Sequence, residues 1–394
     1  MRTRNNIDRI RLALLVLLAV ASAIAHAERP PQQQQQQQPP PTIKANTQGT
    51  PHVDLVIALD TSSSMDGLID SARAKLWDIV NLLARAKPRP VLRIGLLSYG
   101  NDGYDSKIGW VRKESDLTSD LDSVYAKLFA LRTNGGTEYV ARAVHAAVNE
   151  MSWDASQETL RIVFVAGNEP ADQDPDIKLP DAAKEADKHR VRVNTIYCGN
   201  EGNHEKSGWQ ALATLARGGY NSIDQTEVAA IPTPMDGELA KLSSELNETY
   251  VAYGKDADKK KANQAAQDSN AGRMGAASAA TRAQAKASAM YRAGDWDLVD
   301  AQKESGGAAL AKMPAASLPA EVAALPPEKR EAYVAAKAKK REEIQKRITE
   351  MSAKRDAFVR DERSRRAKAG KAALDDAMNA TIQKQAEESL NLAF

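Results

Sequence analysis

The stretch VDLVIALDTSSSM, residues 53–65, is the part of this 394-residue chain that decides its fold. Its first seven residues are apolar except for Asp54, as expected of a β-strand that helices cover on both faces. The strand ends at Asp60 in a run of polar residues, and residues 68–86 then show the apolar spacing of a helix. A buried strand that leads through a polar turn into a helix is typical of a parallel α/β sheet.

The same alternation of apolar runs and helical patterns continues to about residue 254. It predicts a doubly wound, mostly parallel sheet, in which ligands bind at the carboxyl ends of the strands. We expect this α/β domain to span residues 51–254. The predicted strands are residues 53–59, 91–98, 107–111, 160–166, 191–197 and 220–223, and the predicted helices are residues 68–86, 117–130, 139–151, 180–188, 205–216 and 236–253.

Residues 1–27 have the three parts of a secretory signal peptide. Four arginines precede the apolar run 12–21, and Ala25-His26-Ala27 supplies the small residues that a signal peptidase prefers. An uncleaved membrane anchor is the alternative, but the apolar run is shorter than the roughly 20 residues that a spanning helix needs. We therefore expect an exported protein, in a bacterial periplasm or outside the cell, with no transmembrane segment once the signal is cut.

The chain on either side of the α/β domain has a different composition. Residues 28–50 are rich in Gln and Pro and predict a disordered linker. Residues 255–326 are rich in Ala and Lys and predict a second, low-complexity linker. Residues 327–394 predict a helical hairpin or coiled-coil-like tail, although charged residues interrupt the stripe that contains Ile344 and Ile348. The C-terminal region is therefore expected to be helical and partly disordered, and its helices could serve in oligomerisation.

Overall charge and cysteine content exclude some classes of partner and site. Lys and Arg total 54 against 52 Asp and Glu, for a net charge of +2, so no basic surface for nucleic acid is expected. The basic runs 259–261 and 363–366 have acidic neighbours and are best interpreted as solvated helix faces. Cys198 is the single cysteine, which excludes an intramolecular disulfide and a metal site built from paired cysteines.

A D-x-S-x-S motif, Asp60, Ser62 and Ser64, follows the first predicted strand directly. A hard cation such as Mg²⁺ prefers oxygen ligands and usually retains several waters. One carboxylate and two hydroxyls could hold such an ion and leave it electrophilic enough to accept a carboxylate from a partner. Asp and Ser are also common in turns and at helix N-caps, so this motif alone does not establish a metal site.

Two later segments place further oxygen atoms at the same predicted sheet edge. Thr137 follows Gly135-Gly136 in a loop before a helix, and Asn168 follows the strand 160–166. With these segments in this order, residues 53–225 resemble a von Willebrand factor A domain and its metal-ion-dependent adhesion site. Further stretches, residues 194–200, 209–210 and 318–320, are similar to a bacterial exported subgroup with a helical tail.

The resemblance implies a Rossmann-like fold with Asp60, Ser62, Ser64 and Thr137 at a metal ion, Mg²⁺ or else Mn²⁺ or Ca²⁺. It also implies a protein partner that offers an acidic side chain to that ion. Asn168 stands where the family usually has an aspartate, so the site is expected to have lost one negative charge. The neighbouring acidic residues that could compensate are Glu169, Asp172 and Asp174.

Three functional hypotheses remain open from the sequence. The first is metal-dependent protein binding through this site, with Asn168 completing the ligand set. The second is an envelope scaffold that acts through its helical tail and carries a metal-free domain. The third, an enzyme, is disfavoured: G-x-S-x-G and the P-loop motif are absent, and Gly208 stands where H-E-x-x-H would need its second histidine after His204.

Overall fold

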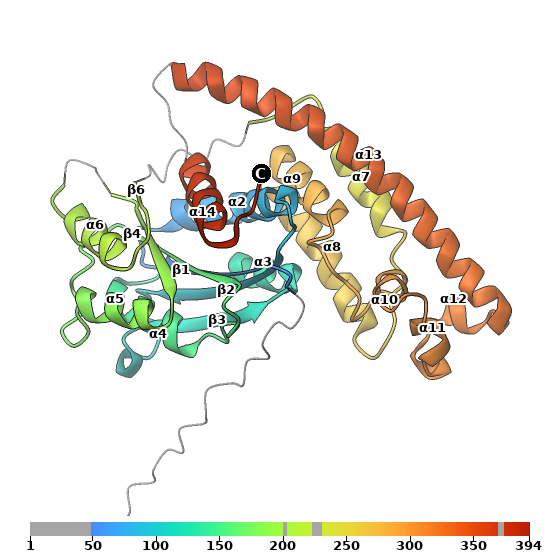
Figure 1. Ribbon diagram of the computed structural model, residues 1–394, viewed down its shortest axis with the longest axis horizontal. Coiled ribbons are helices and arrows are strands. Elements are labelled where there is room, and N and C mark those ends of the chain that lie inside the picture. The colour runs from blue at the N-terminus through green and yellow to red at the C-terminus, as the bar shows by residue number, and fades with distance from the viewer. Residues whose placement is uncertain (1–48, 200–202, 223–230, 369–373) are drawn as a thin grey trace, which may run out of the picture. The chain divides into compact units, whose positions relative to one another are not determined.

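Strand β1 (His52–Asp60) lies in the middle of the sheet that organises the chain (Figure 1). The computed structural model describes residues 49–199, 203–222, 231–368 and 374–394. The predicted signal peptide and nearly all of the predicted linker 28–50 lie outside the described residues. The other strands are β2 (Val91–Tyr99), β3 (Val111–Thr118), β4 (Thr159–Gly167), β5 (Val191–Tyr197) and β6 (Tyr220–Ser222).

The described residues form a six-stranded sheet with the order β3-β2-β1-β4-β5-β6. All neighbouring strands are parallel except β2 and β3, which pair antiparallel. The predicted mostly parallel, doubly wound sheet is therefore confirmed. One strand was predicted in the wrong place: residues 106–108 form a short 3₁₀ helix, and the edge strand follows it at Val111–Thr118.

Both faces of the sheet are buried beneath helices, which explains the nearly continuous apolar strands (Figure 1). Successive side chains of a strand point to opposite faces. Leu55 and Ile57 therefore join the core beneath α2 (Asp66–Arg85) and α3 (Leu121–Ala130). Val56 and Ala58 join the core on the other face, beneath the three helices that follow later in the chain. Those helices are α4 (Val140–Glu150), α5 (Leu179–Lys188) and α6 (Lys206–Leu215).

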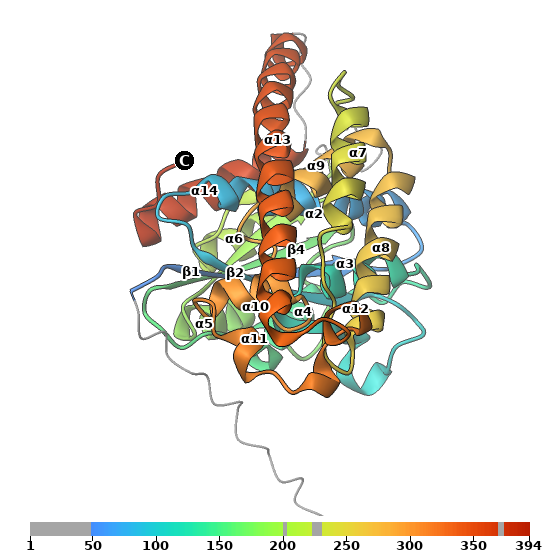
Figure 2. The ribbon, with the colours of Figure 1, turned by 90° about the vertical axis from the view of Figure 1, so that its right-hand side faces the viewer.

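The first face is completed by the C-terminal helix α14 (Leu374–Leu390), which packs on α2, β4 and β6. Its side chains Met378, Ile382 and Ala386 belong to the same core as the odd-numbered residues of β1. The predicted hairpin is thus wrong, because α14 docks on the sheet whereas α13 (Pro327–Lys368) packs on α7 (Asp236–Asn247) and α9. Figure 2 shows α13 running beside α7.

Residues 255–326, predicted to be a linker, are folded into helices with their own core. Ala280 and Ala283 pack against Leu242, Trp296 and Ile348. The described helices of this region are each too short or too polar to cross a membrane. The helices are α8 (Ala257–Arg273), α9 (Ala276–Ala287), α10 (Leu298–Glu304), α11 (Ala309–Lys312) and α12 (Ala320–Ala323).

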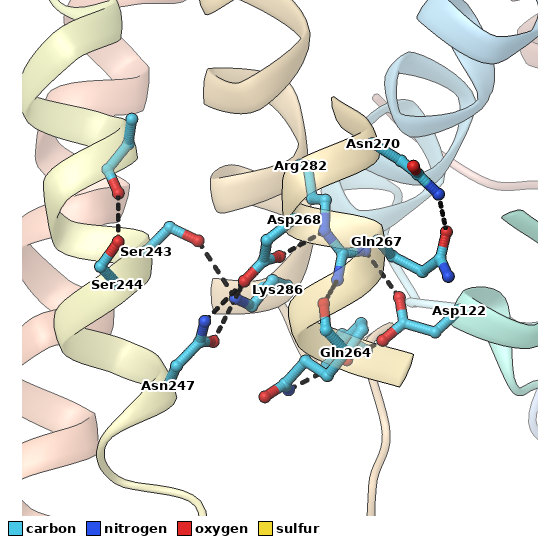
Figure 3. A network of polar contacts seen from close by, with 12 residues as sticks. Asp122, Ser243, Ser244, Asn247, Gln264, Gln267, Asp268, Asn270, Arg282 and Lys286 are labelled. Atoms are coloured by element: carbon cyan, nitrogen blue, oxygen red, sulfur yellow. Dashed lines mark hydrogen bonds and ion pairs between the residues drawn. The ribbon is translucent and has the colours of Figure 1, made fainter. Parts of the chain in front are cut away.

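A buried polar network joins these helices to the sheet domain (Figure 3). The Arg282 guanidinium on α9, which is 1% exposed, donates to Asp122 of α3 at 2.6 Å and also to Asp268 of α8. The Lys286 ammonium, equally buried, donates to Asp268 at 2.8 Å and to Asn247 of α7. Buried charges are tolerated when they are paired in this way, so the network adds to the apolar contacts that Ala271 and Ala285 make with the core of the sheet domain.

Candidate metal centre

Asp60 is the last residue of β1 and lies at the carboxyl edge of the sheet, beside Tyr99 of β2. The neighbour of β1 on the other side is β4, which ends at Gly167. After β1 the chain builds β2 and β3 on one side, and then crosses to build β4 on the other side of β1. Asp60 therefore lies where the strand order reverses, which is where ligands bind in such sheets. Its side chain is 0% exposed. The oxygen Oδ1 accepts a hydrogen bond of 2.8 Å from the backbone N–H of Ser62, whereas Oδ2 has no partner.

The hydroxyls of the D-x-S-x-S motif lead from this buried carboxylate to the surface. Ser62 is 1% exposed, and its Oγ lies 3.3 Å from Oγ of Ser64, which is exposed. The amide of Asn168, just after β4, contacts Oγ of Ser64 at 3.2 Å from Nδ2 and 3.4 Å from Oδ1. Four predicted site residues from two strand ends therefore form one continuous set, open on the side of Ser64 and Asn168.

The Gly-Gly-Thr loop is bound to the first loop through its backbone. The N–H of Ser63 donates to the carbonyl of Gly135 at 3.0 Å, and the N–H of Asn134 donates to the carbonyl of Thr61, also at 3.0 Å. Thr137 follows in this loop and is half-buried. These paired bonds hold the two loops in one arrangement, so the fold places the loop of the fifth predicted residue beside the other four.

A second buried carboxylate, Glu138, follows Thr137 and was not predicted as a site residue. Its side chain is 4% exposed. Burial, and then the charge of Glu138, raise the pKa of Asp60 well above its ordinary value. Burial also raises the pKa of Glu138. The only sequence signal was position, since Glu138 directly follows the Gly-Gly-Thr segment.

Comparison with known proteins agrees with this geometry. Residues 54–233 match the family model of the von Willebrand factor type A domain. This part of the chain is a von Willebrand factor type A domain. The match ends before α7, and α14, which completes the sheet face, comes from far outside the matched range. A search of curated protein sequences found no match.

Several solved structures overlap with the A domain of this chain. Proximal thread matrix protein 1 from the mussel byssus is 12% identical over 46% of this chain and 43% of its own, with a TM-score of 0.35; another crystal structure of that protein is described as having a zinc-occupied MIDAS motif. The SpRpn10 VWA domain is 15% identical over 46% of this chain and 95% of its own (TM-score 0.34). The pilus adhesin SpaC from Lactobacillus rhamnosus GG is 14% identical over 47% of this chain and 29% of its own (TM-score 0.34). This chain thus spans less than half of the mussel protein and of the adhesin.

Of the acidic residues that were expected to supply the negative charge that Asn168 lacks, at least one is already paired. Asp174 is bound by the Arg142 guanidinium through two hydrogen bonds of 2.8 Å, and this pairing lowers the pKa of Asp174 against the effect of burial. Glu169 and Asp172 are exposed. Asp174 therefore stabilises the loop after β4, and the role of the other predicted residues as metal ligands stays a prediction.

The donor set of the A domain fits a hard divalent cation. It combines an unpartnered, fully buried carboxylate oxygen on Asp60 with hydroxyls and an amide, and Mg²⁺ prefers such oxygen ligands together with water. Within the described part of the chain, no three His, Cys, Asp or Glu side chains gather as a metal cluster. The donors gathered at this candidate site are mainly hydroxyls, which differ from the His and Cys ligands typical of structural zinc sites.

Proposed function

We propose that the A domain binds a partner protein through a divalent cation held by Asp60, Ser62, Ser64, Thr137 and Asn168. Mg²⁺ is the proposed ion, with Mn²⁺ or Ca²⁺ as alternatives, and the partner supplies an Asp or Glu side chain as a further ligand. The observation that carries this proposal is the buried Oδ2 atom of Asp60, which lacks any hydrogen-bond partner in the described structure. A buried acceptor of this kind is costly to leave unsatisfied, and a cation would satisfy it.

The order of the ligands favours capture of an external group. Asp60 and Ser62 are buried, whereas Ser64 is exposed and Asn168 is half-buried. An ion bound among them would be held by Asp60 and Ser62 on its buried side, and a partner's side chain could reach it from the side of Ser64 and Asn168. When bound, the cation would supply positive charge with weakly charged ligands on its outer side, which suits a carboxylate better than a neutral group.

Binding rather than catalysis is proposed, because the residues that would support hydrolysis are placed elsewhere. His145 and His204 are exposed, and His189 pairs with Glu185 at 3.1 Å. The balanced net charge of +2 gives nucleic-acid binding no support. Export to a periplasm or the cell exterior, and kinship with a bacterial exported subgroup, are proposed from the sequence of residues 1–27 and from the stretches that resemble that subgroup.

The scaffold hypothesis, in which the C-terminal helices make the essential contacts, receives less support. An oligomerisation arm needs apolar residues on its surface, yet Ile344 and Ile348 of α13 and Ile382 of α14 are buried within the chain. The same side chains would have to leave their present cores to bind a second copy.

An array of short peptides tests the proposed function. Each peptide is made in an acidic form and in a form with Asp and Glu replaced by Asn and Gln. The chain from residue 28 is applied with Mg²⁺ or with a chelator, as are Asp60→Ala and the control Glu150→Ala, which changes an exposed acid at the end of α4. We expect binding that requires both Mg²⁺ and the acidic form, disappears in Asp60→Ala and persists in the control. Binding that survives the chelator, or the absence of any acid-dependent binding, would contradict the proposal.

A further inference from the structure

Glu138 is buried without any cationic partner among the described residues. It precedes α4, is 4% exposed, and its Oε2 atom makes no hydrogen bond. Glutamate is almost never fully buried unless it is paired. Apart from Asp60, the other buried carboxylates follow that rule; Asp122 and Asp174, for example, face an arginine at 2.6 and 2.8 Å. Glu138 therefore occupies a position that calls for a partner.

The nearest ionisable neighbour of Glu138 is the other unsatisfied carboxylate of the site. Asp60 and Glu138 flank Gly100, because a Cβ atom added there would lie 2.8 Å from Oδ1 of Asp60 and 2.9 Å from Cγ of Glu138. Each carboxylate also has one oxygen without a partner. Two adjacent buried carboxylates cannot both stay ionised unless a positive charge lies beside them. The pair thus has the composition of a cation site, and Gly100 allows both side chains to lie against its backbone.

The two carboxylates of Asp60 and Glu138 can explain why the site has Asn168 where the family usually has an aspartate. Asp60 alone would place one negative charge against a divalent ion, and Asn168 adds none. Asp174 is held by Arg142, and Glu169 is exposed. We infer that Glu138 is the second carboxylate of the cation site and supplies the charge that Asn168 does not. This inference rests on the proposed function, since it concerns the same ion.

A carboxylate at the buried position 138, instead of at the half-buried position 168, has a consequence for how the site would bind an ion and a partner. Asn168 and Ser64 lie on the open side, whereas Asp60 and Glu138 are buried. Two carboxylates would neutralise a divalent ion, so the protein alone should hold it without a partner's acid. The two ligands on the open side, Ser64 and Asn168, would add no negative charge of their own, which favours the approach of an acidic side chain.

Titration of Mn²⁺ into the chain from residue 28, followed by calorimetry, tests the inference. We expect Glu138→Gln to weaken Mn²⁺ binding by at least about tenfold, and the control Glu150→Gln, at an exposed glutamate that ends α4, to leave it unchanged. Adding Asn168→Asp to Glu138→Gln should restore affinity, because it returns the missing charge to the site. Glu138→Asp, which retains the charge, should bind more tightly than Glu138→Gln.

The stability of the metal-free protein gives an independent readout. In a chelator, Glu138→Gln should raise the melting temperature, because it removes one of two adjacent buried carboxylates. If Glu138 had only a structural role, the variant would melt earlier and bind Mn²⁺ as the unmodified chain does, which would overturn the inference. If Asp60→Ala abolished binding while Glu138→Gln and Glu138→Asp did not weaken it, only the inference would fail. If the unmodified chain bound no Mn²⁺, the proposed function itself would fail.

Discussion

Gly135 has no side chain because two constraints meet at its position. Its φ of +71° lies in the left-handed region that favours glycine, and an added Cβ atom would lie 2.0 Å from Cγ of Asp102. Gly135 also accepts the hydrogen bond from Ser63 that ties the two site loops together. The glycine is therefore needed to hold the loop that contains Thr137 and Glu138 against the loop that follows Asp60.

Gly135→Ala is expected to reduce both stability and metal binding. Backbone strain and the clash with Asp102 should cost about 1–3 kcal/mol, and the displaced loop should weaken Mn²⁺ binding. Gly237→Ala is a matched control, since it lies in α7 with nothing within 4 Å of the added Cβ. Urea denaturation and Mn²⁺ titration measure both effects. Equal stability of the two variants would contradict the role assigned to Gly135.

At the scale of the elements, the sequence predicted most of the A domain and the helical character of the tail, but it missed how the surrounding helices pack. Strands β1, β2, β4 and β5 were found within about a residue because both their faces are apolar. The edge strand β3 was misplaced, since only Val111 and Leu117 of it are buried, and its alternation is weak. The proximity of Asp60 and Asn168 could be predicted because the topology brings strand ends together, whereas the burial of Glu138 depends on loop packing.

The packing of the helices after the A domain was missed for a different physical reason. Arg341 and Arg355, which interrupt the apolar stripe of α13, are both buried and paired, Arg341 with Asp297 at 2.6 Å and Arg355 with Asp236 at 2.9 Å. Their partners are 44 and 119 residues away in the sequence. Local periodicity counts such arginines as surface residues, so a core that depends on ion pairs looks like a solvated helix.

Lys286 makes the stability of this region depend on pH. Burial lowers the pKa of Lys286 from 10.5 to about 8. Between these values the unfolded chain binds a proton that the folded chain does not, so the free energy of unfolding rises with pH through this window. The contribution of deprotonated Lys286 is thus present above the unfolded pKa and lost as the pH falls through about 8.

Denaturation of the unmodified chain and of Lys286→Met at several pH values measures this contribution. From pH 8 to 10, the stability of the unmodified chain should increase relative to that of the variant, by at most about 1.4 kcal/mol per pH unit. A difference between the two proteins that stays constant over this range would show that Lys286 is not deprotonated on folding.

At the scale of the whole molecule, the A domain is assembled from two distant parts of the chain. Strands β1 to β6 lie within His52–Ser222, but α14 at the C-terminus covers β4 and β6 beside α2. A backbone bridge between Lys87 and Ala393 also attaches the chain end to the domain. The predicted domain 51–254 leaves out α14, because a helix that docks from a distant part of the sequence leaves no local signal of where it packs.

Shortening a buried side chain of α14 should therefore destabilise the A domain. Ile382→Ala removes a fully buried side chain from the core beneath the sheet and should cost about 2–5 kcal/mol. Lys384→Ala, on the exposed side of the same helix, should change stability by less than about 0.5 kcal/mol. The tryptophan fluorescence of Trp77 and Trp209 reports unfolding of the domain. Equal stability of both variants would show that α14 is dispensable.

The most direct test of the central claim is anomalous diffraction from crystals of the chain from residue 28 grown with Mn²⁺. We expect an anomalous peak between the Asp60 carboxylate and the hydroxyls of Ser62 and Ser64, and no such peak in Asp60→Ala. An ordered site without a peak, or a peak that persists in Asp60→Ala, would contradict the account of a cation centre at the carboxyl edge of this A domain.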